Sequence, residues 1–204
     1  GGAVLAFVLL TSVLIKSSFA PAMMEWVGAG QYNWLLLMGA FMFTGWLSQK
    51  WAMAGGNPAK QYMGLGLSVA SYAVIFVPIL YMAANFSDAS VIPKAGLMTG
   101  LVFGGLTATV FVTKKDFSFM GKVLMIGGWV AMGLIVTSIL FGFNLGTLFA
   151  AGMVALCSGY ILYYTSNIMR HYPIGSHVAA SLALFGSLAM LFYYILMIFM
   201  RSRD

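Results

Sequence analysis

The stretch GYILYYTSNIMRHY, from Gly159 to Tyr172, places a group of polar side chains at the end of a long hydrophobic segment. A short basic loop with Arg170 and His171 follows, and after it comes a second hydrophobic run from Val178 to Met200. Polar groups in hydrocarbon are costly unless they find partners. The pattern therefore predicts two membrane helices, the first of which carries polar side chains with a structural or functional task.

The composition of the chain indicates an integral membrane protein. Of its 204 residues, 62% are hydrophobic and 7% are charged, whereas a soluble domain has about 25% charged residues. The ten Lys and Arg residues give a net charge of +6, which we interpret as a determinant of membrane topology. Because the basic residues are scattered, we expect binding to the lipid bilayer and not to nucleic acid. The four acids are Glu25, Asp88, Asp116 and Asp204.

Seven segments approach the length of about 20 apolar residues that a membrane-spanning helix needs. They predict an all-α integral membrane protein with seven transmembrane helices in a single domain, residues 1–204, whose first helix is truncated at its start. Pro78 predicts a kink in the third segment, and Pro21, Gly28 and Gly30 predict a loop after the first. The segments are Ala3–Ile15, Asn33–Leu47, Tyr62–Ala84, Val91–Val112, Phe119–Phe141, Thr147–Ile168 and Val178–Met200.

The distribution of basic residues between alternate loops predicts the orientation of the chain. One set of loops, with the start of the fifth segment, holds six basic residues and the other set holds four, so the first set is expected in the cytoplasm. This places the N-terminus in the cytoplasm and the C-terminus on the opposite side. The first set comprises Lys50, Lys60, Lys114, Lys115, Lys122 and Arg170, and the second comprises Lys16, Lys94, Arg201 and Arg203.

Small residues at helical spacing predict contacts between membrane helices. Gly96, Gly100 and Gly104 form a GxxxGxxxG pattern on the fourth segment, and Ala183 and Gly186 share a face of the seventh. Glycine at this spacing lets another helix backbone approach closely. A last helix with small residues on much of its surface can be enclosed by its neighbours, but ordinary membrane packing uses the same residues, and the periodicity does not distinguish the two.

The polar face of the sixth segment is the first candidate for a functional site. Tyr160, Tyr164 and Asn167 are spaced i, i+4, i+7 and therefore share one face of a helix. They could form one wall of an ion or proton path. The interpretation that we favour is hydrogen bonding between helices, which in membranes averages about 0.6 kcal/mol per contact. Ser166 beside them and Ser187 on the seventh segment complete the candidate set.

Residue patterns for catalysis, cofactors and metals are missing from the sequence. It has no Ser-His-Asp set, no HExxH and no CxxC motif, and Cys157 is its one cysteine. That cysteine cannot form an intramolecular disulfide or a cysteine metal cluster. His171 and His177 have no acid or cysteine nearby, and we interpret them as surface residues at the membrane boundary. We therefore expect no enzyme activity, no cofactor and no bound metal.

Three stretches of the chain resemble the Bax-inhibitor family of multi-pass membrane proteins: TKKDFSF, ILYYTSNIM and HVAASLALFGSLAMLFYYILMIFM. The resemblance implies seven transmembrane helices with the last enclosed by the other six. It also implies a cation leak path, because channel-like members have one carboxylate on the sixth helix and one on the seventh, and these share a proton. Two carboxylates close together cannot both ionise easily, so one of them takes a raised pKa.

This sequence departs from the family pattern at both carboxylates. Tyr164 stands where many members have aspartate, and Val178–Met200 contains no Asp or Glu, Ser187 being nearest to the expected place. A tyrosine with an ordinary pKa near 10 stays neutral at physiological pH. We therefore expect a non-transporting accessory or regulatory membrane subunit that binds a partner within the bilayer, as part of a larger membrane protein complex. The alternative is a calcium leak channel. The expected location is a bacterial inner membrane or an organelle membrane.

Overall fold

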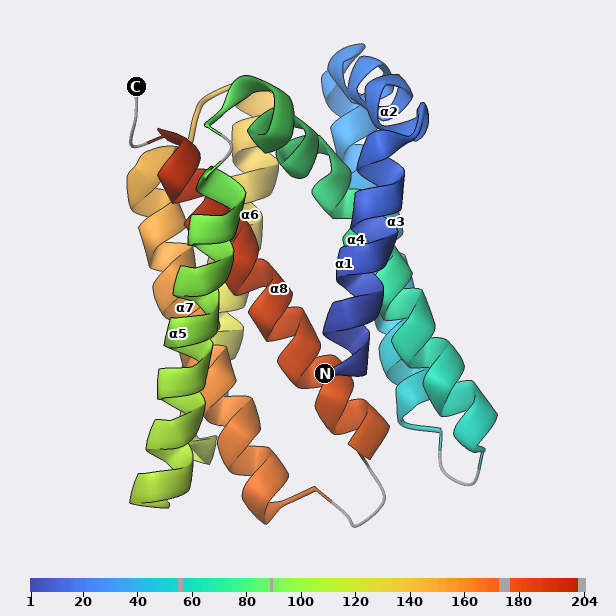
Figure 1. The fold of residues 1–204 in the computed structure, drawn as a ribbon. Coiled ribbons are helices and arrows are strands. Elements are labelled where there is room, and N and C mark those ends of the chain that lie inside the picture. Colours follow the sequence, from blue (N-terminus) through green and yellow to red (C-terminus); the bar gives the residue numbers. More distant parts are fainter. Residues whose placement is uncertain (55–56, 89, 173–176, 202–204) are drawn as a thin grey trace. The chain divides into compact units, whose positions relative to one another are not determined.

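The computed structural model of the chain describes residues 1–54, 57–88, 90–172 and 177–201. Within these ranges the chain forms eight α-helices, one short 3-10 helix and no β-strand (Figure 1), which confirms the all-α prediction. In chain order the elements are α1 (Gly2–Lys16), α2 (Phe19–Gly28), α3 (Gln31–Ala52), α4 (Pro58–Phe86), α5 (Val91–Thr113), η1 (Ser118–Met120), α6 (Gly121–Phe141), α7 (Gly146–Arg170) and α8 (His177–Arg201).

Among the residues that the structure describes, five helical segments are long and apolar enough to cross a membrane, namely α4, α5, η1 with α6, α7 and α8. The pair α1 and α2 adds a sixth if it forms one broken span, and its two helices are bent by 78° from each other. The 22-residue helix α3 is not in this group. Seven spans therefore remain a prediction, although six of the predicted segments lie within one α-helix each and the fifth covers η1 and α6.

The predicted loop after the first segment is wrong, because most of it forms α2. Pro21 is the third residue of this helix. The first four N–H groups of a helix have no partner within it, so proline costs little there. Gly28 is the last residue of α2, and Gly30 precedes α3 in an extended conformation. Pro78 lies inside α4, which continues through it to Phe86, and the kink expected at this residue stays a prediction.

The contacts of the chain divide it into two compact units. Unit 1 contains Gly1–Asn85 and the first part of α8, up to Gly186. Unit 2 begins at Phe86 and contains α5, η1, α6, α7 and the part of α8 from Ser187 onward. Each unit is described separately below, and the single domain of seven helices stays a prediction.

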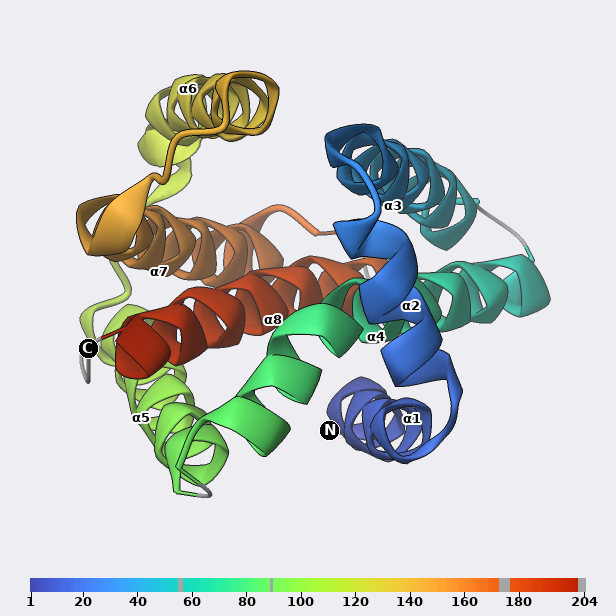
Figure 2. The same ribbon diagram turned by 90° about the horizontal axis from the view of Figure 1, so that it is seen from above.

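Unit 1 is held together by apolar and aromatic contacts between its helices. Helix α2 connects α1 to α3 (Figure 2), and its Ala20 and Met23 pack with Val77 of α4. The Phe7 ring of α1 meets the Phe76 ring of α4 edge to face, with centroids 5.1 Å apart. It also meets Phe185 of α8 at 5.9 Å. Such offset ring pairs add to the free energy gained by burying the rings.

Helices α3 and α4 approach each other closely at Gly64. A Cβ atom at this position would lie 2.6 Å from the carbonyl oxygen of Ser48 and 2.8 Å from the backbone nitrogen of Ala52. Backbone atoms cannot move aside as the end of a flexible side chain can. Gly64 is therefore required by the crossing of these two helices.

In unit 2, α7 lies between α5 and α6 and contacts both (Figure 2). The contact with α6 depends on glycines, because a Cβ at Gly159 would lie 2.7 Å from Leu124 and one at Gly127 would lie 2.8 Å from Leu156. Gly142 caps the C-terminal end of α6, and its φ of +70° favours glycine. Lys114 caps the C-terminal end of α5 in the same left-handed region, with a φ of 51°.

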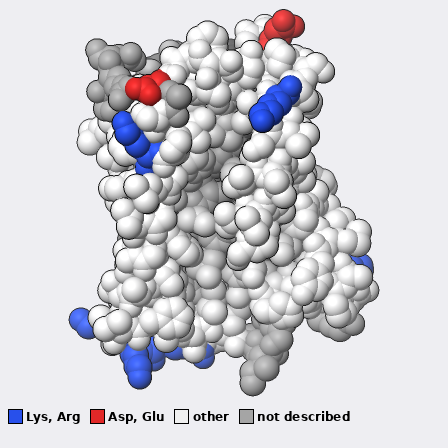
Figure 3. Space-filling model, viewed as in Figure 1, with Lys and Arg blue, Asp and Glu red and all other residues white. Residues whose placement is uncertain are grey.

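The surface of the described residues is apolar between the helix ends. On the face in Figure 3, the charged side chains lie near the ends of helices, and the surface between them is uncharged. Large apolar side chains face outward on α6, where Trp129 is 71% exposed and Val123 is 67% exposed. Contiguous apolar surface of this kind belongs against lipid or another membrane protein.

We predict that Gly64→Ala destabilises the protein and that Gly66→Ala, two residues away on α4, does not. Alanine normally stabilises a helix relative to glycine by about 0.5–1 kcal/mol, but a Cβ at Gly64 clashes with backbone and should cost roughly 1–3 kcal/mol. A Cβ at Gly66 meets no described atom within 4 Å. Thermal unfolding in detergent measures both variants. Equal midpoints would show that the crossing of α3 and α4 does not depend on Gly64.

Candidate functional site

Tyr160 joins α7 to α6 by a hydrogen bond. Its hydroxyl donates to the backbone carbonyl of Leu124 over 2.9 Å. The approach is possible because Gly128 has no side chain, and a Cβ there would lie 3.1 Å from the Tyr160 hydroxyl oxygen. This geometry matches the interhelical hydrogen bond that the sequence left open as one of two interpretations. The donor proton of Tyr160 is thus used in holding the two helices together.

The aromatic rings of α7 pack against one another. Tyr160 and Tyr164 have the four-residue spacing of a shared helix face, and their rings are stacked with centroids 5.8 Å apart and planes 19° apart. Tyr163 meets Tyr164 edge to face at 5.3 Å. The Tyr163 ring also lies over Gly121 of α6, where a Cβ would come within 2.9 Å of it. Tyr164 is half-buried in this cluster.

Ser166 anchors the loop that follows α5. Its side chain is fully buried, accepts a hydrogen bond from the backbone N–H of Phe117 at 3.0 Å and donates to the carboxylate of Asp116 at 3.4 Å. The same carboxylate oxygen accepts the backbone N–H of Ser118 at 2.8 Å. We refer to Ser166, Asp116, Phe117 and Ser118 as the Ser166 cluster. It connects two parts of unit 2 that are about fifty residues apart in sequence.

Arg170 makes a second connection between α7 and the same loop. Its guanidinium donates a hydrogen bond to the backbone carbonyl of Lys114. That residue is the left-handed C-cap of α5. Guanidinium groups suit carbonyls at a helix C-terminus, where partial negative charge gathers. The last turn of α7 and the end of α5 are therefore fixed to each other at the edge of the apolar region.

Asp116 remains ionised at neutral pH. The backbone N–H of Ser118 lowers the pKa of its carboxyl most, and the Ser118 hydroxyl and the charges of Arg170 and His171 lower the pKa further. An acid with a lowered pKa stabilises the fold above its unfolded pKa of about 3.9, and this contribution is lost as the pH falls through the folded pKa. Asp116 therefore does not act as a switch near neutral pH.

The other predicted site residues lie in different surroundings. Asn167 is half-buried, and its backbone carbonyl accepts the N–H groups of His171 and Tyr172 at the end of α7. Ser187 is buried on α8. Thus the structure stacks Tyr160 on Tyr164, places Ser166 in its own cluster, and uses the backbone of Asn167 to end a helix. Whether they line a path for ions stays a prediction.

The predicted packing residues divide into two groups. A Cβ at Gly96, Gly100 or Gly104 would meet no described atom within 4 Å, so this ridge of α5 is open in the structure. Gly186 differs, since a Cβ there would lie 2.9 Å from the hydroxyl oxygen of Tyr72 on α4. Ala183 is buried on the same helix. The role of the α5 ridge in helix contacts stays a prediction.

The arrangement of acids and histidines does not form a metal site among the described residues, where no three His, Cys, Asp or Glu side chains come together. His171 follows α7 and is exposed. His177 begins α8, and its Nε2 lies 3.2 Å from the hydroxyl of Tyr62. Asp204 lies outside the described residues.

Sequence reasoning missed Asp116 and Phe117 as partners of Ser166. Asp116 stands two residues before Ser118, and an aspartate that accepts the N–H two residues on is a recognisable local turn. That signal could have placed Asp116 at a fixed turn. The hydrogen bond between Ser166 and Asp116 has no signal in the local sequence, because it depends on how α5 and α7 pack.

We predict that Ser166→Ala lowers the free energy of unfolding by roughly 1–2 kcal/mol, since it removes the acceptor of the Phe117 N–H and one donor to Asp116. The control is Ser158→Ala, on the same helix, whose hydroxyl donates only to the Val154 carbonyl one turn away. Chemical unfolding in detergent compares the two variants. If both lose equally little, Ser166 does not anchor the loop.

Comparison with known proteins gives one family. The sequence model of the family described as "Inhibitor of apoptosis-promoting Bax1" matches residues 1–204. Bax inhibitor 1 of Schizosaccharomyces pombe is 36% identical over 122 residues, which cover 57% of this chain and 44% of that protein. The Escherichia coli protein named Modulator of FtsH protease YccA is 35% identical over 134 residues, which cover 64% of this chain and 60% of that protein.

A protein of Pseudomonas aeruginosa without an assigned function is 38% identical over 124 residues, covering 60% of this chain and 55% of its own length. The chain therefore spans about half the length of the curated relatives it matches. No solved structure matches the chain.

Proposed function

Because this chain belongs to the Bax inhibitor family of multi-pass membrane proteins, whose sequence model it matches from end to end, we propose that it is an accessory or regulatory subunit of a larger membrane protein complex. In this role it binds its partner within the bilayer and conducts no ions itself. We expect no catalytic activity. The finer arrangement that accompanies the proposal is a single domain of seven spans with the last helix enclosed by the others.

The absence of acids from the sequence of the long helices carries this proposal. Helices α4 to α8 contain no Asp or Glu, although negative charge is the usual means by which a protein replaces the hydration shell of a cation. At the position of the family's sixth-helix acid, Tyr164 is packed between two other tyrosine rings. The nearby Asp116 is held by Ser118 and Ser166 and stays ionised at neutral pH.

The proposed partner is a membrane protein, and one relative suggests its kind. The relative from Escherichia coli is named a modulator of the FtsH protease, so we propose a protease of this type, and a bacterial inner membrane as the location. The described loops are short. A partner must therefore be met mainly by outward-facing apolar side chains, of which α6 offers Val123, Ile126 and Trp129.

A calcium leak channel is the second candidate, and two buried hydroxyls favour it. Thr107 of α5 and Thr165 of α7 have buried side-chain oxygens without a hydrogen-bond partner among the described residues. These two helices pack against each other. Buried hydroxyls without partners are uncommon, and they can bind water or a weakly held ion. They provide neutral oxygens only, so a path along them would not be gated by pH near neutrality.

We predict that the purified protein in liposomes shows no more calcium flux than protein-free liposomes and no steep change of flux between about pH 6 and 7. Adding acids with Tyr164→Asp and Ser187→Asp together should create a pH-dependent flux if the scaffold is channel-like. The control is Tyr164→Asn with Ser187→Asn, which cannot ionise. Calcium flux from the unmodified protein clearly above that of protein-free liposomes, whether or not it changes with pH, would favour the channel over the accessory subunit.

The same protein, carrying an affinity tag and extracted from its native membrane in mild detergent, should elute with a larger assembly that contains a second membrane protein. Crosslinking before extraction preserves weak complexes. If the crosslinked protein elutes alone and conducts calcium, the accessory role is wrong.

The proposed orientation places the N-terminus in the cytoplasm. We predict that a cysteine at Asn57 reacts with an impermeant thiol reagent only from the cytoplasmic side, and that one at Asp88 reacts only from the other side. The native Cys157 is 5% exposed, so it should contribute little background. Labelling intact cells and inverted vesicles distinguishes the two sides, and the reverse pattern overturns the orientation.

A further inference from the structure

Four basic residues meet where α5 and α7 end, within unit 2. Lys114 and Lys115 follow α5, and Arg170 and His171 are at the end of α7. All four are exposed. Basic side chains gather below the ends of these two helices in Figure 3. We refer to these four residues as the basic end of unit 2.

The backbone holds two of these cations in a fixed arrangement. Lys114 has a φ of 51° and is the one described residue other than glycine in the left-handed region. Its carbonyl accepts the hydrogen bond from the Arg170 guanidinium. Strained backbone of this kind gathers at functional positions. Bases that only set membrane topology must lie on the correct side of the membrane but need no fixed contact with one another.

The acid of this loop does not neutralise the two lysines. The Asp116 carboxylate accepts the backbone N–H of Ser118 and the hydroxyl of Ser166. Besides Ser118, which lowers the pKa of this carboxyl most, the charges that act on it are those of Arg170 and His171. Both lysines therefore remain available to an anion from outside.

Exposed apolar side chains adjoin the two lysines on both sides in the chain. Val112, near the end of α5, is 81% exposed, and Phe119, in η1, is 74% exposed. Apolar surface of this kind belongs against hydrocarbon, so the lysines lie where the hydrocarbon of a bilayer meets its headgroups. The apolar stem of a lysine covers such surface while its ammonium group reaches the polar layer.

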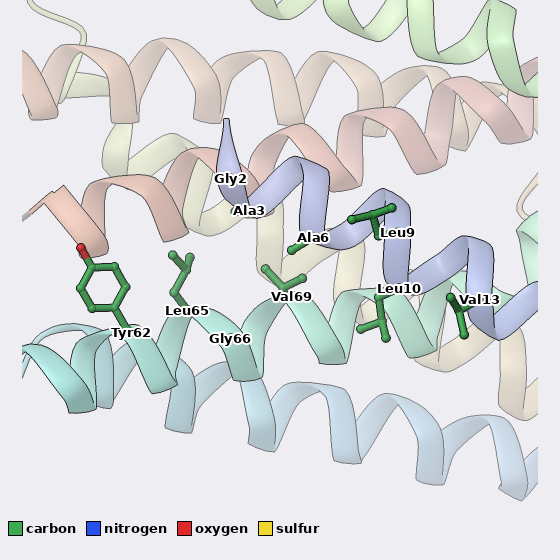
Figure 4. Close-up of a pocket in the computed structure, with 10 residues that line it drawn as sticks. All are labelled: Gly2, Ala3, Ala6, Leu9, Leu10, Val13, Tyr62, Leu65, Gly66 and Val69. Atoms are coloured by element: carbon green, nitrogen blue, oxygen red, sulfur yellow. The ribbon is translucent and has the colours of Figure 1, made fainter.

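The hollow between α1 and α4 in unit 1 lacks this combination (Figure 4). Apolar side chains and glycines line it, and the Tyr62 hydroxyl is the polar group among the lining side chains. An amphipathic anion needs positive charge beside apolar surface. The basic end of unit 2 provides both, and this hollow provides apolar surface alone.

We propose that the basic end of unit 2 binds the phosphate of an anionic phospholipid through Lys114 and Lys115. Lysine ammonium groups donate charge-assisted hydrogen bonds to phosphate oxygens, and the positive charge of the site favours an anionic headgroup over a zwitterionic one. The acyl chains extend along the apolar surface beside Phe119. An acidic protein segment would offer carboxylates but no hydrocarbon for that surface. The proposal does not depend on the accessory role proposed above.

The first test compares two headgroups on the purified protein. Delipidated protein in detergent is incubated with dioleoylphosphatidylglycerol or dioleoylphosphatidylcholine, and native mass spectrometry measures the fraction that retains lipid. We expect the unmodified protein to prefer phosphatidylglycerol. Lys114→Gln with Lys115→Gln should lower this affinity at least tenfold, because each base near an anionic headgroup contributes roughly a fivefold factor.

The matched control is Lys16→Gln with Lys94→Gln, which removes two exposed lysines at other helix ends. It lowers the net charge by the same amount and should keep the affinity of the unmodified protein. Binding in detergent does not depend on the direction in which the chain inserts into a membrane. A change of topology therefore cannot produce the difference between the two double variants.

Asp116→Asn tests the site in the opposite direction. The asparagine side-chain oxygen can still accept the N–H of Ser118, while the negative charge beside the lysines is removed. We expect the affinity for phosphatidylglycerol to rise several-fold, a gain that loss of folding cannot mimic.

Three results would each show that the proposal is wrong: equal losses in the two double variants, equal binding of the two lipids, or an unchanged affinity in Asp116→Asn. Two competitors test other occupants. Displacement of the lipid by millimolar inorganic phosphate would assign the site to a soluble phosphate compound, and displacement by a glutamate-rich peptide would assign it to an acidic protein segment. Either displacement overturns the lipid assignment.

Discussion

Hydrogen bonding in the absence of water is the constraint on which the placement of polar side chains in this protein depends. Within the described helices, hydroxyls mostly donate to carbonyls of their own helix one turn back, as Thr11 does to Phe7 and Thr99 to Ala95. Tyr160 extends the same solution to a neighbouring helix by donating to the Leu124 carbonyl. Because hydrocarbon offers no other partner, most hydroxyls here bond within their own helix, and Tyr160 connects two helices by the same kind of bond.

The sequence predicted the helical segments well, because length and hydrophobicity alone determine where a membrane helix can lie. The prediction was wrong at α2, because a proline is compatible both with a loop and with the first turn of a helix, and Pro21 occupies the first turn. It also could not rank glycines. Gly64 is pressed against backbone atoms while Gly100 faces open space, and this difference depends on which side of each helix meets a neighbour, which spacing along the chain does not encode.

The candidate site was predictable in its residues and not in its connections. The spacing of Tyr160 and Tyr164 predicted a shared face, and their rings are stacked. The acceptor of Tyr160 is a backbone carbonyl, however, and every residue has one, so no sequence pattern could identify it. Ser166 was singled out for its polarity, but its bond to Asp116 joins residues brought together by the packing of α5 and α7. Tertiary contacts thus decided what each polar residue does.

The proline within α4 has a mechanical consequence. Pro78 lacks an N–H, so the carbonyl of Val74 loses the donor that the helix would otherwise supply, and the ring presses on that turn. Buried side chains surround this point, including Phe76, Val77 and Ile79. In this helix of 29 residues, the turn that lacks a backbone hydrogen bond resists bending less than a fully bonded turn does. We therefore expect thermal bending of α4 to concentrate at this turn, with one stiffer helical segment on each side of it.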